Sequence, residues 1–175
     1  MKRPLYKRIF DLTILISAHI ILLPIWLFLW LIIPLLIIFE DGMPIFYGQK
    51  RIGVGGKEFI VYKFRTMVKD ADKKGPSWTV EGDPRVTKVG RILRKTALDE
   101  LPSLLSILKG DMSFVGPRAL AVEEQKVLER KIPNFEKRLQ VRPGLTGLAQ
   151  VFNLEDNPYI KLHYDLEYIK NMSLW

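Results

Sequence analysis

Residues 12–39, which read LTILISAHIILLPIWLFLWLIIPLLIIF, decide how this chain folds. The stretch carries no formal charge, and roughly 20 apolar residues are enough to cross the hydrocarbon core of a bilayer. It is too long for a signal-peptide core and lacks a small-residue cleavage site, so we expect it to be retained. The alternative is a buried helix of a soluble protein, but a domain of 175 residues could hardly surround it.

The charges beside this stretch indicate how it meets the membrane. Basic residues lie on both sides of it: Lys2, Arg3, Lys7 and Arg8 before it, and Lys50, Arg51, Lys57, Lys63 and Arg65 after it. Basic flanks mark the cytoplasmic side, so both ends are expected on the same side. Pro24 lacks a backbone N–H and predicts a break between two halves of about 18 Å each. We therefore expect a re-entrant helix-break-helix, with a straight span mildly kinked at Pro24 as the alternative. Pro34 marks either the exit from the membrane or a second bend.

The overall composition narrows the possible partners and sites. Lys and Arg outnumber Asp and Glu by 27 to 19, giving a net charge of +8, which favours anionic partners. No cysteine is present, which excludes disulfides, zinc-thiolate sites and cysteine nucleophiles. The chain has two histidines, so a histidine-rich metal site is excluded as well.

After residue 43 the pattern changes to that of a small α+β domain. Aromatic and β-branched segments predict strands at residues 44–48 and 58–64, with the glycines of residues 53–56 in a hairpin turn. Helices are predicted at residues 101–109, ended by Gly110, at residues 123–131, ended by Pro133, and after the capping pair Asn157-Pro158. The polar residues 71–84 predict a loop, and Trp78 within it contacts a lipid or a base, or is simply packed. The aromatic residues of the last helix suit a membrane interface and a packed core equally well: Tyr159, Tyr164, Tyr168 and Trp175.

Two adjacent carboxylates, Asp99 and Glu100, are the first candidates for chemistry. Arg91, Arg94 and Lys95 precede them closely, and a helix start supplies free backbone N–H groups for an anion. The carboxylates could hold a divalent cation through oxygen ligands, or one of them could attack phosphorus. The alternative is that both simply stabilise the dipole of a first helical turn.

Two further segments combine a tight turn with an arginine. Residues 110–118 (GDMSFVGPR) end with Arg118, and residues 141–150 (VRPGLTGLAQ) contain Arg142. Arginine binds phosphate through two parallel hydrogen bonds, so both are candidate phosphate ligands. A solvated surface arginine is the alternative for each.

Five motifs in this order resemble the monotopic phosphoglycosyl transferases, the bacterial sugar transferase family. They are KRIFD at residues 7–11, YKFRTM at 62–67, LDELP at 98–102, KGDMSFVGPR at 109–118 and VRPGLTG at 141–147. The match runs from the start of the chain to its end, and its length is similar to the small form with little beyond the catalytic domain. Two positions depart from the family pattern: Leu23 stands where a serine often precedes the membrane proline, and Ala119 stands where a second proline often follows the arginine.

The resemblance implies a reaction, a location and roles for particular residues. It implies Mg²⁺-dependent transfer of a sugar 1-phosphate from a UDP-sugar to polyprenyl (undecaprenyl) phosphate, releasing UMP, on the cytoplasmic face of the bacterial inner membrane. Asp99 matches the nucleophile that forms an aspartyl phospho-sugar, and Glu100 matches the second member of the pair, which assists in metal binding or in the management of protons and charge. Arg94, Arg118 and Arg142 match phosphate-binding positions, and Lys63 lies in a matching motif.

The predicted organisation is a re-entrant helical hairpin over residues 1–40 and a cytoplasmic-face catalytic region over residues 41–175, together one structural unit. Membrane lipids are expected partners and nucleic acid is not, since no nucleic-acid motif is present. A competing class is a non-catalytic, membrane-anchored basic module that binds anionic lipid or nucleic acid. That class explains the charge and the apolar stretch, but it does not explain an acidic pair among arginines.

Overall fold

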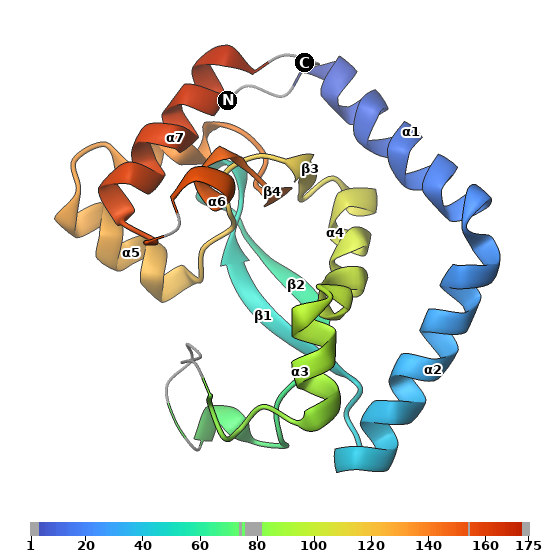
Figure 1. The fold of residues 1–175 in the computed structure, drawn as a ribbon. Coiled ribbons are helices and arrows are strands. Elements are labelled where there is room, and N and C mark those ends of the chain that lie inside the picture. Colours follow the sequence, from blue (N-terminus) through green and yellow to red (C-terminus); the bar gives the residue numbers. More distant parts are fainter. Residues whose placement is uncertain (1–3, 74, 76–81, 154, 173–175) are drawn as a thin grey trace. The chain divides into compact units, whose positions relative to one another are not determined.

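The structure is a computed structural model that describes residues 4–73, 75, 82–153 and 155–172 (Figure 1). Contacts within the chain divide it into two units. The first unit contains Met1–Ser17, Gln49–Val61 and Leu104–Trp175, and the second contains Ala18–Gly48 and Tyr62–Ser103. Both helices and short strands are present, in agreement with the expected α+β class.

Two consecutive helices account for the apolar stretch. A single residue, Leu22, separates helix α1 (Leu5–Ile21) from helix α2 (Leu23–Asp41), and it has φ −100° and ψ 20°. Pro24 lies in the first turn of α2, where a missing N–H costs no helical hydrogen bond. The predicted break near Pro24 is therefore confirmed. Pro34 lies inside α2 and does not end it.

Most of the apolar surface of α2 lies outside any protein core. Within the described part of the chain, α2 is the one helix long and apolar enough to cross a membrane, with a mean hydropathy of 2.4. Only 11% of its most apolar 18-residue stretch is buried, whereas the core helix of a soluble protein would be mostly buried. The exposed apolar face fits a lipid environment, and the re-entrant path through the membrane stays a prediction.

Side chains also connect the two sides of the break. The indole Nε1 of Trp26 donates a hydrogen bond to the carbonyl oxygen of Ala18 at 3.2 Å, and that oxygen also accepts from the backbone N–H of Leu22 at 3.0 Å. The imidazole of His19 stacks on the Trp26 ring, with ring centroids 4.5 Å apart. These contacts hold the end of α1 to the start of α2, at the position where Leu23 provides no hydroxyl.

The predicted hairpin consists of strand β1 (Phe46–Ile52), the short 3-10 helix η1 (Val54–Gly56) and strand β2 (Glu58–Phe64). β2 matches the prediction, but β1 begins and ends later than residues 44–48. The polar residues Gln49, Lys50 and Arg51 hid its second half, because they lie in a strand beside β2 although Lys50 is exposed and Gln49 and Arg51 are only half-buried. Gly55 and Gly56 have φ of 67° and 79°, a left-handed conformation that glycine adopts without strain.

The second unit has a core between α2 and the elements that carry the acidic pair. Helix α3 (Lys88–Lys95) begins after Thr87, whose hydroxyl accepts a hydrogen bond from Gly90 N–H, and the 3-10 helix η3 (Leu98–Ser103) follows it. Ile33 and Ile37 of α2 pack with Phe64 and Leu93 in this core. The 3-10 helix η2 (Ala71–Lys73) starts the predicted polar loop, half of which, with Trp78, lies outside the described residues.

The first unit contains the remaining elements, two of which form a second sheet. In chain order they are α4 (Leu104–Lys109), β3 (Ser113–Val115), α5 (Val122–Lys131), η4 (Phe135–Gln140), β4 (Gly144–Thr146), α6 (Leu148–Phe152) and α7 (Pro158–Asn171). β3 and β4 pair in parallel, with Ser113 opposite Gly144 and Val115 opposite Thr146. Two apolar clusters fill this unit, one around Ile107 and Val61 and the other around Phe135 and Leu120.

The later helices agree with the sequence except at the acidic pair. α5 matches the helix expected at residues 123–131, and Asn157 caps α7 by accepting from the N–H groups of Tyr159 and Ile160. Trp175 lies outside the described residues. The helix expected at residues 101–109 instead consists of η3 and then α4, with Pro102 inside η3. Asp99 and Glu100 consequently lie within a 3-10 helix and not just before a helix.

Candidate active site

Asp99 and Glu100 lie in η3 beside the ammonium group of Lys63 from β2. Lys63 Nζ is 2.5 Å from Glu100 Oε1, and both side chains are about three-quarters buried. The Asp99 residue is 8% exposed. Burial raises the pKa of the Asp99 carboxyl, Lys63 opposes this shift, the charge of Glu100 adds to it, and Arg94 opposes it again. The two carboxyls of the pair therefore differ, with Glu100 ion-paired and Asp99 desolvated.

Arg94 is held near this pair by a residue that sequence reasoning missed. Its Nε donates a hydrogen bond to Thr66 Oγ1 at 2.9 Å, and Thr66 is buried. The Thr66 carbonyl oxygen accepts from Thr87 N–H at 3.0 Å, just before α3. A Cβ atom on Gly90 would lie 2.0 Å from that same oxygen, so only glycine lets α3 approach so closely. Thr66 belongs to the quoted motif at residues 62–67, which was the signal available for finding it.

The acidic residues at the end of α2 attach this helix to the same unit. The Glu40 carboxylate accepts hydrogen bonds from the N–H groups of Lys88 and Val89, at 2.6 and 2.8 Å, and so caps the first turn of α3. Asp41 accepts from the backbone N–H of Lys69 at 2.7 Å and lies 3.3 Å from the guanidinium of Arg65. The apolar helix is thereby connected directly to the helix that carries Arg94.

Arg118 and Arg142 belong to the first unit, where the β3–β4 pairing brings their two motifs together. Gly116 N–H donates to the Thr146 carbonyl and Gly144 N–H donates to the Pro117 carbonyl, both at 2.9 Å. A Cβ atom on Gly144 would lie 2.1 Å from Gly116 N, so the two backbones require glycine there. Sequence reasoning treated these motifs separately and missed that they pair.

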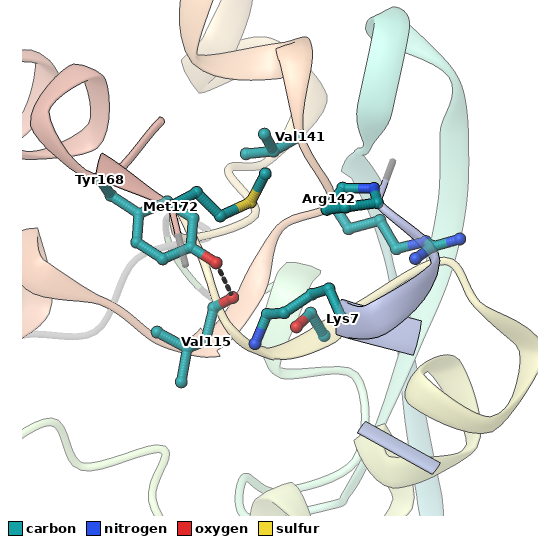
Figure 2. A pocket seen from close by; sticks show the side chains of 8 residues that line it. Lys7, Val115, Val141, Arg142, Tyr168 and Met172 are labelled. Carbon is teal, nitrogen blue, oxygen red and sulfur yellow. Dashed lines mark hydrogen bonds between the residues drawn. The ribbon is translucent and has the colours of Figure 1, made fainter. Parts of the chain in front are cut away.

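A small hollow lies next to this sheet, and Figure 2 shows its lining. Its walls come from Pro4, Lys7, Ser113, Val115, Val141, Arg142, Tyr168 and Met172. The Tyr168 hydroxyl donates to the Val115 carbonyl at 2.7 Å, and burial, with smaller contributions from Asp11 and Tyr6, raises the pKa of Tyr168 to about 12.

The KRIFD motif at residues 7–11 attaches α1 to α4 and β3 of the first unit. The buried carboxylate of Asp11 accepts hydrogen bonds from Ser113 Oγ at 3.0 Å and from Phe114 N–H at 3.2 Å. Lys7 Nζ lies 3.6 Å from Asp11 Oδ1, and the Arg8 guanidinium donates to the carbonyls of Ile107 and Leu108. These residues act as connections between α1, α4 and β3.

The structure brings together four of the six predicted site residues. Lys63, Arg94, Asp99 and Glu100 gather within the second unit. Arg118 is exposed and Arg142 is half-buried in the first unit, and their roles toward a phosphate stay predictions.

The carboxylates fit a magnesium ion that takes further ligands from a substrate. In the ranges that the structure describes, no three His, Cys, Asp or Glu side chains gather as a metal site. Mg²⁺ is commonly bound by one or two carboxylates together with substrate phosphates and water. Asp99 and Glu100 supply that number of oxygen ligands, so a diphosphate would have to complete the coordination.

Known proteins are similar to almost the whole chain. It is 40% identical over 164 residues to the UDP-N-acetylgalactosamine-undecaprenyl-phosphate N-acetylgalactosaminephosphotransferase of Aeromonas hydrophila, an alignment covering 91% of this chain and 39% of that protein. It is 40% identical to the undecaprenyl-phosphate galactose phosphotransferase of Salmonella typhimurium, covering 97% and 37%. It is also 42% identical to the exopolysaccharide production protein ExoY of Sinorhizobium fredii, covering 96% and 78%.

The chain spans about two fifths of the length of the first two relatives and over three quarters of the third. Residues 2–175 match the protein family described as bacterial sugar transferase. This match confirms the family that the five motifs predicted. The chain therefore belongs to the bacterial sugar transferase family.

Proposed function

We propose that this protein transfers a sugar 1-phosphate from a UDP-sugar to polyprenyl phosphate, giving polyprenyl-diphospho-sugar and UMP. The observation that carries the proposal is the buried carboxyl of Asp99 beside the Lys63–Glu100 ion pair and Arg94. The names of two relatives, which act on undecaprenyl phosphate and transfer N-acetylgalactosamine phosphate or galactose phosphate, support the same reaction class.

Asp99 acts as the nucleophile in a two-step reaction. One of its carboxylate oxygens attacks the β-phosphorus of the UDP-sugar, and the bond from that phosphorus to the bridging oxygen breaks, so that UMP leaves with the oxygen. An oxygen of polyprenyl phosphate then attacks the phosphorus of the aspartyl phospho-sugar, and the bond to Asp99 breaks. The carboxylate is thereby regenerated, and a covalent intermediate divides one difficult transfer into two.

The surroundings of Asp99 suit this role. Burial that raises the pKa of a carboxyl also makes its anion less solvated and more basic, and hence a better nucleophile. Lys63 and Arg94 offset the negative charge that a diphosphate would bring. Arg118 and Arg142 stay candidate phosphate ligands on the strength of the motif match.

Mg²⁺ is the proposed cofactor, and Asp99 and Glu100 are its proposed ligands. When bound, the ion neutralises charge on the diphosphate. Activity should vanish when EDTA removes the metal and return when Mg²⁺ is restored. Full turnover in EDTA would remove the metal from the proposal and leave the role of Asp99 standing.

The location that we propose is the cytoplasmic face of the bacterial inner membrane, with α1 and α2 as a re-entrant hairpin. The largely exposed apolar surface of α2 supports membrane insertion. The Glu40 cap on α3 supports a short connection from that helix to the catalytic residues. Polyprenyl phosphate, the acceptor of the reaction, would then reach the catalytic residues at the membrane surface.

A panel of UDP-sugars tests the overall reaction. Purified protein in detergent or nanodiscs should release UMP with at least one UDP-sugar when undecaprenyl phosphate and Mg²⁺ are present, and an undecaprenyl-diphospho-sugar should appear. Asp99→Asn should abolish both products while the protein stays folded. If no UDP-sugar gives UMP and vesicle binding is equal in wild type and Asp99→Asn, the non-catalytic basic module is the correct class.

A further inference from the structure

The backbone around Arg118 is held by an unusual run of hydrogen bonds. Four consecutive carbonyl oxygens accept one each, and every donor belongs to the first unit. Pro117 O accepts from Gly144 N–H at 2.9 Å, and Leu120 O accepts from Ile52 N–H at 3.0 Å. The two oxygens between them accept from arginine side chains, Arg118 O from Arg138 Nη2 at 2.7 Å and Ala119 O from Arg51 Nη1 at 2.9 Å.

Arg138 is the more deeply buried of the two arginine donors. It lies in η4 and is 2% exposed. Its Nε donates to Asp165 Oδ2 of α7 at 2.8 Å, and its Nη1 donates to Gln125 Oε1 of α5 at 3.0 Å. The guanidinium lies over the Phe135 ring, 5.3 Å from the ring centroid. One side chain thus connects two helices with the loop that carries Arg118.

Only arginine can make this set of contacts. Its planar guanidinium presents five N–H donors in a fixed fork, and three different nitrogens are used here toward three acceptors. A lysine at the same position would keep the charge for Asp165 but has a single nitrogen. It could not also reach Gln125 and the Arg118 carbonyl.

We propose that Arg138, assisted by Arg51, is a positioning residue that fixes the Arg118 loop so that the exposed Arg118 guanidinium meets a substrate phosphate. The inference rests on the proposed function, because it takes Arg118 as a phosphate ligand. The two arginines donate to the carbonyls of two consecutive peptides, Arg118–Ala119 and Ala119–Leu120. These peptides flank Ala119, which stands where the family pattern often has proline. Side-chain hydrogen bonds therefore restrain the loop where this chain lacks the proline ring.

A double-mutant cycle separates positioning from general stability. Arg118→Ala should raise the KM of one substrate, and Arg138→Lys should raise the KM of that same substrate by about tenfold with a small effect on kcat, since a hydrogen bond from a charged donor is lost. In the Arg118→Ala background, Arg138→Lys should cause no further change in KM. It should still lower the melting temperature in both backgrounds, because its structural contacts are lost in each.

Two further variants complete the design. Arg51→Met removes the hydrogen bond to Ala119 at a half-buried site. It should also raise KM only when Arg118 is present, by a smaller factor than Arg138→Lys. This variant keeps the test available if Arg138→Lys does not fold. Lys161→Met is the matched control, because Lys161 is a buried cation of the same unit that pairs with Asp156 and Glu124 and not with residues 117–120. It should lower the melting temperature without changing either KM.

Each contrary outcome has a distinct meaning. If Arg138→Lys and Arg51→Met raise KM by equal factors with and without Arg118, or leave KM unchanged although Arg118→Ala raises it, the positioning role is wrong. If Arg118→Ala leaves both KM values unchanged, the inference also falls, because no phosphate contact exists to be positioned. The proposed function would survive either result, since it is decided by UMP release and its loss in Asp99→Asn.

Discussion

Lys63 Nζ lies 2.5 Å from Glu100 Oε1, so the ammonium group from β2 neutralises one carboxylate of the acidic pair in η3. The other carboxyl, Asp99, is buried next to this ion pair. Lys63 lowers the pKa of Asp99 and Glu100 raises it, with burial as the largest effect. The pair is therefore asymmetric: Glu100 contacts the Lys63 ammonium group directly, and Asp99 is a desolvated carboxyl whose charge depends on its cationic neighbours.

Removing Lys63 should move the pH dependence of the reaction. Without this cation the pKa of Asp99 rises further, so a larger fraction is protonated, and non-nucleophilic, at a given acidic pH. The acid limb of kcat/KM for UMP release should shift to higher pH in Lys63→Met, and Lys63→Arg should keep it near the wild-type position. An unshifted acid limb in an active Lys63→Met protein would show that Lys63 does not control the charge of the nucleophile.

Asp99→Asn should stabilise the fold at neutral pH even though it abolishes activity. The pKa of Asp99 is higher in the folded than in the unfolded chain, so the folded state binds more protons, and its stability falls as pH rises from about 4 through the folded pKa. Asparagine carries no charge, so it removes this loss of stability at high pH. The melting temperature of Asp99→Asn should exceed that of wild type at pH 7.5, and the difference should shrink toward pH 4.5. A gain that is equal at both pH values would contradict the raised pKa.

Thr66 should matter through Arg94. Thr66→Val keeps the shape of the side chain but removes the acceptor for Arg94 Nε, a hydrogen bond of about 1.5 kcal/mol or more because its donor is charged. We expect kcat/KM to fall roughly tenfold, while Thr66→Ser, which retains the hydroxyl, keeps most of the activity. Equal losses in the two variants would instead point to packing of the threonine methyl group.

The membrane topology can be tested because the chain has no native cysteine. With the break at Leu22 and basic residues on both flanks, single cysteines at Arg3 and Lys50 should both resist a membrane-impermeant thiol reagent in intact cells and react after lysis. Labelling of Arg3→Cys from outside, with Lys50→Cys protected, would establish a span instead of a hairpin. Adding Trp26→Ala to each single-cysteine variant tests whether the hydrogen bond from Trp26 to the Ala18 carbonyl helps to hold both flanks on the same side of the membrane.

Local signals in the sequence predicted much of this fold. Pro24 predicted the helix break, aromatic and β-branched residues predicted β2, and Asn157-Pro158 predicted the start of α7, because each depends on neighbours along the chain. The β3–β4 pairing could not be predicted in this way, since each strand has three residues and their partners lie about thirty residues apart. The 3-10 geometry of η3 was also missed, because a first-turn proline suits an α-helix equally well.

For the candidate site, the sequence identified most of the residues but not the contacts between them. The LDELP motif identified Asp99 and Glu100, and the YKFRTM motif contained Lys63 and Thr66, but neither gave their contacts. The Lys63–Glu100 ion pair and the Thr66–Arg94 hydrogen bond join residues 37 and 28 positions apart. Arg138 carried no signal at all, because a buried arginine between two helices resembles a surface arginine in sequence.

The most direct test of the central claim is the mass of the protein after incubation with its UDP-sugar and Mg²⁺ in the absence of polyprenyl phosphate. A covalent mechanism predicts UMP release of up to one equivalent per protein and a mass increase of one sugar phosphate, located on the peptide that contains Asp99. Asp99→Asn should show neither. If active enzyme releases no UMP until polyprenyl phosphate is added, and no adduct forms, the transfer is a direct displacement and Asp99 is not its nucleophile.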